Sequence, residues 1–269
     1  MLLANGNIYL DYNATTPIDP MVFEAMEPFY HSHFGNASSN HSLGNYNRQA
    51  IDFAREQVAG LLGCQQEDII FTSGGSESNN MALKGIASRR ADQGQHIIVS
   101  KVEHPAILNV VQYLQHQGFR ITYLPVDGQG VVRADDLEEI ITSKTILVSV
   151  MHANNEIGSI QPINELAEVA HAAGAVFHTD AAQSVGKIPV DVSDLGCDLL
   201  SLAGHKLYAP KGVGAIYIKG GVDLEPLIHG ANHENGMRAG TENVAQIVGL
   251  GMAAEIASQK LESEMLRQQ

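Results

Sequence analysis

The chain lacks most features of proteins that bind nucleic acid or cross membranes. Its 269 residues include no tryptophan, and 16 lysines and arginines stand against 30 aspartates and glutamates. The resulting formal charge of -14 repels phosphodiester backbones and anionic lipid, and no basic run with interleaved aromatics offsets it. No apolar run approaches the length of a membrane span. We therefore expect no nucleic-acid partner and no membrane association.

Cysteine is also scarce. Only Cys64 and Cys197 occur, and their spacing fits neither a disulfide framework nor a metal site. Each lies beside apolar residues, which indicates a small hydrophobic core residue. The first residues, MLLANGNIYLDY, have no basic region and only a brief apolar stretch, unlike a secretory signal. We expect a cytoplasmic protein.

What the chain does contain is a regular alternation of strand-like and helix-like segments. An apolar content of 44% over this length is enough to bury a large core. The alternation predicts βα repetition around a mostly parallel sheet, which is an α/β fold. The strand-like runs are DIIFTS, HIIVS, RITYLPV, TILVSV, AVFHTD, DLLSLA and AIYI.

Helical patterns fill the intervals. In NRQAIDFAREQVAGLLG the apolar residues Ile51, Ala54, Val58 and Leu62 fall on one face. PINELAEVAHAAG begins with a proline and stops at a glycine, as helices often do.

Three regions are predicted along the chain. Residues 1–20 hold two prolines and an Asn-Ala-Thr-Thr run, which favours an extended arm. Residues 21–257 form one large domain without a linker or repeat. A last helix begins near Thr241 as N-cap and reaches the end of the chain in residues 258–269, with no stop signal, so we expect a further segment to follow it.

The loops after the strands carry the candidate site residues, because open α/β sheets bind ligands at the carboxyl ends of their strands. After the first strand, Gly74, Gly75 and Ser76 open a helix, and backbone N–H groups there can bind an anion. The same residues also fit a simple turn and helix cap. They match neither a P-loop nor a dinucleotide-binding glycine pattern.

Other strand ends carry further polar side chains. His104 precedes a proline that favours the start of a helix, and the ANNEIG segment supplies two amides and a carboxylate. Asp180 ends an apolar strand with Gln183 three positions on, and Lys206 follows the sixth strand. Taken singly, each has an ordinary alternative: Asp180 could cap a helix and Lys206 could be a surface lysine.

Together these groups indicate one ligand. Pyridoxal phosphate needs an anion site, a lysine amine that can lose its proton to form a Schiff base, and a carboxylate at its ring nitrogen. A nicotinamide enzyme would show a glycine fingerprint, and none is present. His229 and His233 are four residues apart, but glycines around them argue against a helical metal site, so no metal is expected.

The motifs also resemble those of a known family, in its order. YLDYNATTP, FTSGGSESNN, EHPAIL, HANNEIG, HTDAAQSVGKIPVD, GHKLYAPKGVGA and GMRAGTENV are similar to the cysteine desulfurases of the nitrogen-fixation and iron–sulfur-assembly type. That family belongs to the fold type I pyridoxal phosphate enzymes, within the class V aminotransferases. The resemblance implies a three-layer, mostly parallel, seven-stranded sheet with helices on both faces.

The resemblance also implies roles for individual residues. Lys206 resembles the Schiff-base lysine, Asp180 the partner of the pyridine nitrogen, and His104 the residue that stacks on the ring and handles protons. Thr241 resembles a residue that reaches the phosphate in the neighbouring subunit, which implies a homodimer. The other implied cofactor contacts are Gln183 at the ring hydroxyl, Asn155 at the side of the ring, and Gly75, Ser76 and His205 at the phosphate.

The implied reaction converts L-cysteine to L-alanine and passes sulfur to an enzyme cysteine, and then to an iron–sulfur scaffold or sulfur-acceptor protein. Two departures stand against it. Ala203 replaces a serine that donates to the phosphate, and neither Cys64 nor Cys197 matches the persulfide-forming position, which belongs to a C-terminal small domain that the chain does not match. Another lyase or aminotransferase activity, or a non-catalytic remnant, remains an alternative.

Overall fold

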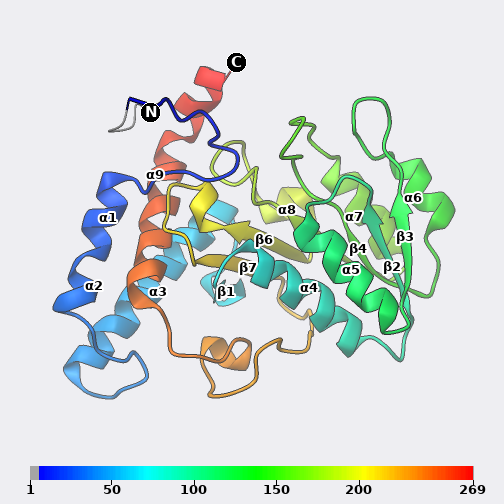
Figure 1. Cartoon of the computed structure of the whole chain (residues 1–269). Coiled ribbons are helices and arrows are strands. Elements are labelled where there is room, and N and C mark those ends of the chain that lie inside the picture. The colour runs from blue at the N-terminus through cyan, green and yellow to red at the C-terminus, as the bar shows by residue number, and fades with distance from the viewer. Residues whose placement is uncertain (1–5, 269) are drawn as a thin grey trace.

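The structure is a computed structural model that describes residues 6–268. The described residues form one seven-stranded sheet with helices packed on both of its faces (Figure 1). The strands are β1 Ile69–Thr72, β2 His96–Ser100, β3 Arg120–Leu124, β4 Thr145–Ser149, β5 Val176–Asp180, β6 Leu199–Ala203 and β7 Gly214–Ile218. The α-helices are α1 Pro20–Met26, α2 Pro28–His31, α3 Ser42–Leu62, α4 Gly75–Arg89, α5 Pro105–His116, α6 Ala134–Ile140, α7 Ile163–Ala172, α8 Val192–Leu195 and α9 Val244–Gln268.

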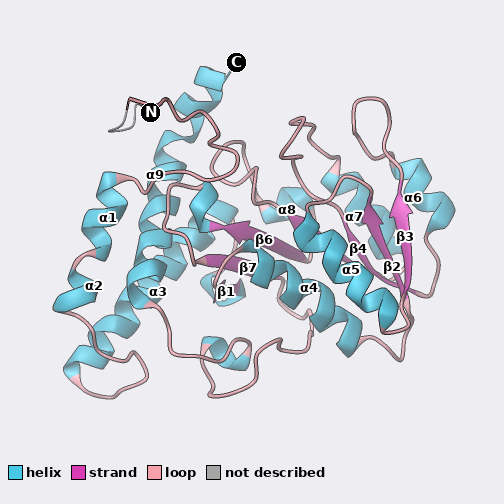
Figure 2. Cartoon of the chain, in the orientation of Figure 1, coloured by secondary structure: helices cyan, strands magenta, loops and turns pink. Residues whose placement is uncertain are grey.

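The sheet has the order β1-β7-β6-β5-β4-β2-β3, and Figure 2 shows its strands in magenta. Neighbours from β6 to β3 pair in parallel, whereas β7 lies antiparallel to both β1 and β6. All seven predicted strands and the mostly parallel sheet are confirmed. Because β1 to β6 point the same way, their carboxyl ends meet at one edge of the sheet.

Alternate strand residues face opposite sides of this sheet. In β1, Ile69 and Phe71 belong to one hydrophobic cluster and Ile70 to the other. Residues of α3, α7 and α9 share the first cluster, and residues of α4 and α5 share the second. The two-residue period of a strand therefore builds the three predicted layers, since each helix face covers one set of strand side chains.

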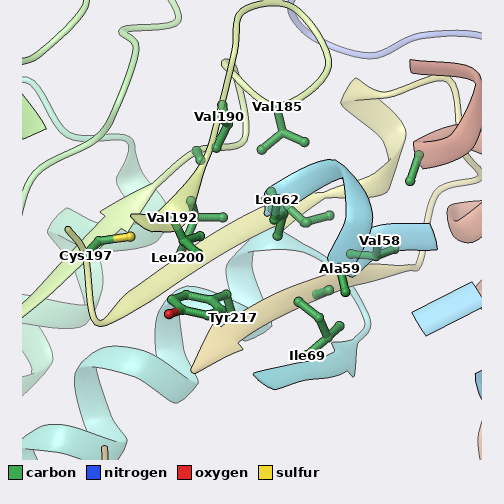
Figure 3. Close-up of a cluster of buried hydrophobic side chains, with 14 of the residues drawn as sticks. Val58, Ala59, Leu62, Ile69, Val185, Val190, Val192, Cys197, Leu200 and Tyr217 are labelled. Atoms are coloured by element: carbon green, nitrogen blue, oxygen red, sulfur yellow. The ribbon is translucent and has the colours of Figure 1, made fainter. Parts of the chain in front are cut away.

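Helix α3 shows how the apolar pattern fixes one of these contacts. Ile51, Ala54, Val58 and Leu62 are all buried, as their spacing predicts. Figure 3 shows Val58 and Leu62 packed over Ile69 and the other strand residues. Gly63 then ends the helix with a positive φ of 69°, a conformation that glycine adopts without steric cost, so α3 stops at the edge of the sheet it covers.

The N-terminal arm lies against the segment that follows β6. Residues 6–19 contain no helix, and the backbone N–H of Thr16 donates to the His205 carbonyl at 3.0 Å. The Thr16 hydroxyl in turn accepts from the N–H of Tyr208 at 3.0 Å. Residues 1–5 of the predicted arm lie outside the described residues. The domain boundaries at residues 20 and 257 stay predictions.

One local prediction is wrong, and one of the alternatives is not observed. Helix α9 begins at Val244, and the side chain of Asn243, not Thr241, accepts a hydrogen bond from the helix N–H of Gln246 at 3.4 Å. Residues 182–187 form turns rather than the helix that Asp180 could have capped, because its carboxylate accepts from the N–H of Ala182 at 3.0 Å and holds the chain in a turn. Among the described helices, none is both long and apolar enough to cross a membrane.

Candidate active site

A cavity of about 960 Å³ opens at the carboxyl ends of the parallel strands. The loops after β1, β2, β4, β5 and β6 all contribute to its walls, as expected for the edge at which parallel strands end. Eight of the nine predicted site residues line it. They are Gly75, Ser76, His104, Asn155, Asp180, Gln183, His205 and Lys206.

Lys206 lies in the 3-10 turn Gly204–Lys206 directly after β6. Its ammonium donates to the backbone carbonyl of Asn13 in the N-terminal arm. Partial burial lowers the pKa of Lys206 below its ordinary value, and the nearby carboxylates of Asp11 and Asp180 oppose that shift. A lysine that is partly desolvated gives up its proton more readily, which is the property that a nucleophilic amine requires.

Asp180 is the last residue of β5 and its carboxylate lies in the cavity wall, 6% exposed. Asn79 of α4 donates to its Oδ2 at 2.7 Å, and the N–H of Ala182 donates to its Oδ1. Burial raises the pKa of Asp180, because these hydrogen bonds and the charges of His104 and Lys206 compensate only in part. Within the described chain the carboxylate forms no direct ion pair, so it fits a ligand that brings a protonated nitrogen.

His104 stands at the start of α5, where its Nδ1 accepts from the N–H of Ala106 at 3.1 Å. Because Nδ1 accepts a hydrogen bond, the neutral ring carries its proton on Nε2. The ring is exposed and lines the cavity. His104 can therefore lie against a flat ligand and still exchange a proton through the free nitrogen.

The anion cradle predicted after β1 is present. Gly74 has a φ of 146° that glycine alone adopts readily, and it places the start of α4 at the cavity, lined there by Gly75 and Ser76. Gly214 of β7 packs directly against this loop: a β-carbon added there would lie 2.7 Å from the Cα of Gly74. The sheet thus supports the free N–H groups of the α4 start, where negative charge is stabilised.

Three other predicted residues complete the rim. Gln183 donates from Nε2 to the carbonyl of Asn13 at 3.0 Å, and Asn155 donates to the Glu156 carboxylate at 2.7 Å. The Nδ1 of His205 lies 3.1 Å from the Thr15 hydroxyl. Burial, followed by the positive charges of neighbouring lysines, lowers the pKa of His205, so it is a neutral hydrogen-bonding group near pH 7.

Thr241 is the predicted site residue that does not join the others. It lines a separate cavity of about 260 Å³ with Phe71, Glu234 and Arg238. Its predicted contact was with the site of a neighbouring subunit, and its position outside the chain's own cavity is compatible with that prediction without testing it.

Sequence reasoning missed three polar groups at this site. Asn79, whose contact with Asp180 is described above, lies one helical turn after Gly75, so helix periodicity places both at the sheet-facing start of α4. The carbonyl of Asn13 accepts hydrogen bonds from both Gln183 and Lys206. The ammonium of Lys187 donates to the side-chain oxygen of Gln183. The contacts to Asn13 cross long stretches of sequence and use a backbone atom, so no local pattern predicts them. The contact between Lys187 and Gln183 joins side chains four residues apart, a spacing that could have indicated it.

Neither cysteine lines the cavity. Cys197 is buried, as predicted, and burial raises the pKa of its thiol to about 12. Cys64 is half-buried at the edge of the core, and burial together with the charge of Asp68 raises its thiol pKa to about 12 as well. A thiol with so high a pKa supplies almost no thiolate near neutral pH, so neither residue is suited to accept sulfur.

The residues present fit pyridoxal phosphate. The unpaired buried carboxylate of Asp180, the cradle at Gly75 and the amine of Lys206 lie around one cavity large enough for a cofactor. Among the other predicted residues on the wall, Asn155 and Gln183 supply amide groups and His104 supplies an exposed imidazole.

Comparisons with known proteins agree with this arrangement. The family model described as aminotransferase class-V matches residues 8–269. A cysteine desulfurase IscS from Dictyoglomus turgidum is 55% identical over 260 residues, which cover 97% of this chain and 66% of that protein. A cysteine desulfurase IscS from Klebsiella pneumoniae is 49% identical over 265 residues, which cover 97% of this chain and 66% of that protein. The chain thus spans 66% of the length of these curated relatives.

Solved structures give the same result. A NifS-like protein superposes with a TM-score of 0.93 and 42% identity, covering 95% of this chain and 71% of that one. A structure described as SspA in complex with cysteine superposes with a TM-score of 0.90 and 41% identity, covering 97% and 78%. The family resemblance and the fold expected from the sequence are confirmed.

Proposed function

This chain belongs to the aminotransferase class-V family, whose members depend on pyridoxal phosphate, and on that premise we propose that it contributes the cofactor-binding part of a cysteine desulfurase. The observation that carries the proposal is the arrangement of Lys206, Asp180 and the Gly75–Ser76 cradle around one cavity. Cysteine enters as the substrate because a similar solved structure is described as a complex with cysteine.

The bound cofactor and the cavity residues would contribute to the reaction in different ways. When bound, the cofactor supplies an electron sink that stabilises negative charge on the carbon beside the substrate amine. Asp180 would accept a hydrogen bond from the protonated ring nitrogen, and that positive charge would compensate the buried carboxylate. Lys206 would supply the amine that anchors the cofactor through its aldehyde, and Lys206 and His104 are the cavity groups that could carry a substrate proton.

The remaining cavity residues orient the cofactor. The start of α4, Ser76 and His205 hold the phosphate, and Asn155 and Gln183 contact the ring edge. In a homodimer, the partner's Thr241 would add a phosphate contact, which fits the position of Thr241 away from its own cavity. The cytoplasmic location and a scaffold or sulfur-acceptor partner stay predictions from the sequence.

In the proposed reaction a cysteine thiolate attacks the substrate sulfur, the carbon–sulfur bond breaks, and alanine and a persulfide result. The attacking thiolate must come from another source than Cys64 or Cys197, since both have strongly raised pKa values and lie outside the cavity. An added small thiol can serve instead.

The test is release of alanine from L-cysteine by the purified chain with pyridoxal phosphate and a thiol acceptor. We expect alanine formation that is abolished in Lys206→Ala. Formation at the same rate in Lys206→Ala would contradict the proposal.

The position of the two cysteines favours one second candidate, a lyase activity that needs no thiolate on the enzyme. L-cysteine sulfinate distinguishes the two reactions, because it loses its sulfur group without a thiol acceptor. Alanine from sulfinate but not from cysteine plus thiol would favour the lyase over the desulfurase.

A further inference from the structure

Four residues form a continuous chain of hydrogen bonds beside the cavity. The ammonium of Lys187 donates to Oε1 of Gln183 at 2.8 Å. Nε2 of Gln183 donates to the carbonyl of Asn13 at 3.0 Å, and the same carbonyl accepts from Lys206. Lys187 itself does not line the cavity that holds the other three residues. Its one hydrogen bond toward the site therefore runs through the amide of Gln183.

The chemistry of the two ends fixes the orientation of that amide. An ammonium can only donate hydrogen bonds and a backbone carbonyl can only accept them. If the Gln183 amide flipped, its NH₂ group would face the ammonium of Lys187 and its oxygen would face the oxygen of Asn13. Both hydrogen bonds would be lost and replaced by repulsive contacts. Lys187 and Asn13 thus select the same orientation, with the NH₂ group on the side of Lys206.

The surroundings of Lys187 show that it is not an ordinary surface lysine. It is half-buried in the turn after β5 and lines a second cavity of about 360 Å³. The other charged groups of that cavity are Asp19, Lys206, Lys260, Glu264 and Arg267. Glu264 is already paired with Arg267 at 2.6 Å. Within the described chain Lys187 forms no ion pair, and its one side-chain hydrogen bond goes to Gln183.

Burial and the charge of Lys206 lower the pKa of Lys187 to about 8. The side chain is therefore still mainly an ammonium at pH 7, although its charge is destabilised there. A half-buried cation without a carboxylate is unfavourable for folding, and the amide of Gln183 is the group that it holds in place.

We infer that Lys187 is a positioning residue that fixes the Gln183 amide with its N–H groups toward the cofactor-binding cavity. The inference rests on the proposed function, in which the acceptor for this amide is the ring oxygen of pyridoxal phosphate. A fixed donor at that oxygen favours the form of the bound cofactor with fewer protons. Lys187 thereby adjusts the protonation of a cofactor that it does not touch.

The test is a pH titration of the absorption of the cofactor bound to the full chain, in the wild type and in Lys187 variants. In Lys187→Met the amide keeps only the Asn13 carbonyl as a partner, and we expect the titration midpoint to rise by about 0.5–1 pH unit, the scale of one hydrogen bond. Lys187→Arg keeps both charge and donor and should stay within about 0.3 unit of the wild type. If Lys187→Met does not retain cofactor, Lys187→Gln tests the same point, since a side-chain amide can donate or accept and no longer fixes the orientation.

A double-mutant cycle separates orientation from simple charge. In a Gln183→Met background, Lys187→Met should cause no further shift, because the amide through which Lys187 acts is gone. The same shift in both backgrounds would show a direct charge effect and overturn the inference, as would an unshifted midpoint in Lys187→Met. A wild-type chain that binds no cofactor would instead contradict the proposed function.

Discussion

Arg238 donates to both carboxylate oxygens of Glu77, from Nε to Oε1 at 2.8 Å and from Nη2 to Oε2 at 3.3 Å. Glu77 follows Ser76 in the first turn of α4 and lines the cavity that also holds Lys206 and Asp180. Burial raises the pKa of Glu77, but the hydrogen bonds from Arg238 and from the N–H of Ser73 outweigh that effect and lower the pKa overall. A fixed negative charge thus lies beside the proposed phosphate site, and Arg238 neutralises it.

Replacing Arg238 should therefore weaken cofactor binding. In Arg238→Met the carboxylate of Glu77 repels the phosphate, and we expect the Kd for pyridoxal phosphate to rise about tenfold, the scale of one lost charge interaction near a surface. Equilibrium titration followed by absorption measures it. In the double variant Glu77→Gln/Arg238→Met the repelling charge is gone and much of the affinity should return. Wild-type affinity in Arg238→Met would contradict this explanation.

Replacing Ala203 by serine should strengthen cofactor binding. A β-carbon added to Gly75 would lie 3.3 Å from the β-carbon of Ala203, so this methyl group faces the anion cradle. A hydroxyl placed there can donate to the phosphate, and Ala203→Ser should tighten binding of pyridoxal phosphate by about 1–3 kcal/mol. Ala203→Cys has a similar shape but a weaker donor and serves as the control. Equal affinities for the serine variant and the wild type would show that the phosphate does not reach Ala203.

Glu103 is expected to make the protein less stable as the pH rises. Its Oε1 accepts from Ser100 at 2.6 Å and from the N–H of Met151 at 2.7 Å, while its buried Oε2 has no hydrogen-bond partner among the described residues. Burial raises its pKa to about 8. Between the pKa that Glu103 has in the unfolded chain and about pH 8, the unfolded chain has lost a proton that the folded protein keeps. The free energy of unfolding therefore falls as the pH rises through that window.

Urea denaturation at several pH values between 5 and 8 tests this effect against Glu103→Gln, which stays neutral. Relative to this variant, the wild type should lose up to about 1.4 kcal/mol of unfolding free energy per pH unit. Parallel stability curves for the two proteins would mean that Glu103 is ionised in the folded state.

His178 is expected to make the protein less stable as the pH falls. The ring is fully buried between the hydroxyls of Ser149, 2.8 Å from Nδ1, and Ser201, 3.0 Å from Nε2, and burial lowers its pKa to about 3. Below about pH 6.5 the unfolded chain binds a proton that the folded protein excludes, so stability falls as the pH decreases.

The variant His178→Gln keeps a polar side chain without this titration. Its unfolding free energy should decrease less between pH 6.5 and 5 than that of the wild type, by up to about 1.4 kcal/mol per pH unit. The comparison uses the protein without added cofactor in both cases. An identical pH dependence would contradict a neutral, buried imidazole.

The sequence predicted those parts of the molecule that depend on local patterns. Strands such as Ile69–Thr72 are apolar runs buried on both faces, and the helix containing Ile51 and Val58 has a regular apolar face. Asp180 was identified because it ends such a strand, and Lys206 because it lies in the turn that follows one. Parallel strands end at one edge, so their strand-end positions alone predict that they meet.

Contacts between distant segments could not be predicted in this way. The arm carbonyl of Asn13 meets Lys206 across more than half of the chain, and it uses a backbone atom that every residue possesses. The start of α9 was misplaced because Thr241 and Asn243 are both good caps, and only the path of the preceding loop decides between them. The contact predicted for Thr241 joins two subunits, so the structure of a single chain does not contain it.

Lys206 is expected to be the covalent anchor of pyridoxal phosphate, and chemical trapping can identify the lysine that bonds to the cofactor. The chain is incubated with pyridoxal phosphate, reduced with borohydride, digested and analysed by mass spectrometry. We predict the cofactor mass on the peptide that contains Lys206, at one cofactor per chain. The label should be lost in Lys206→Ala without transfer to Lys187 or to Lys211, which also lines the cavity. A label spread over several lysines, or unchanged in Lys206→Ala, would contradict the account.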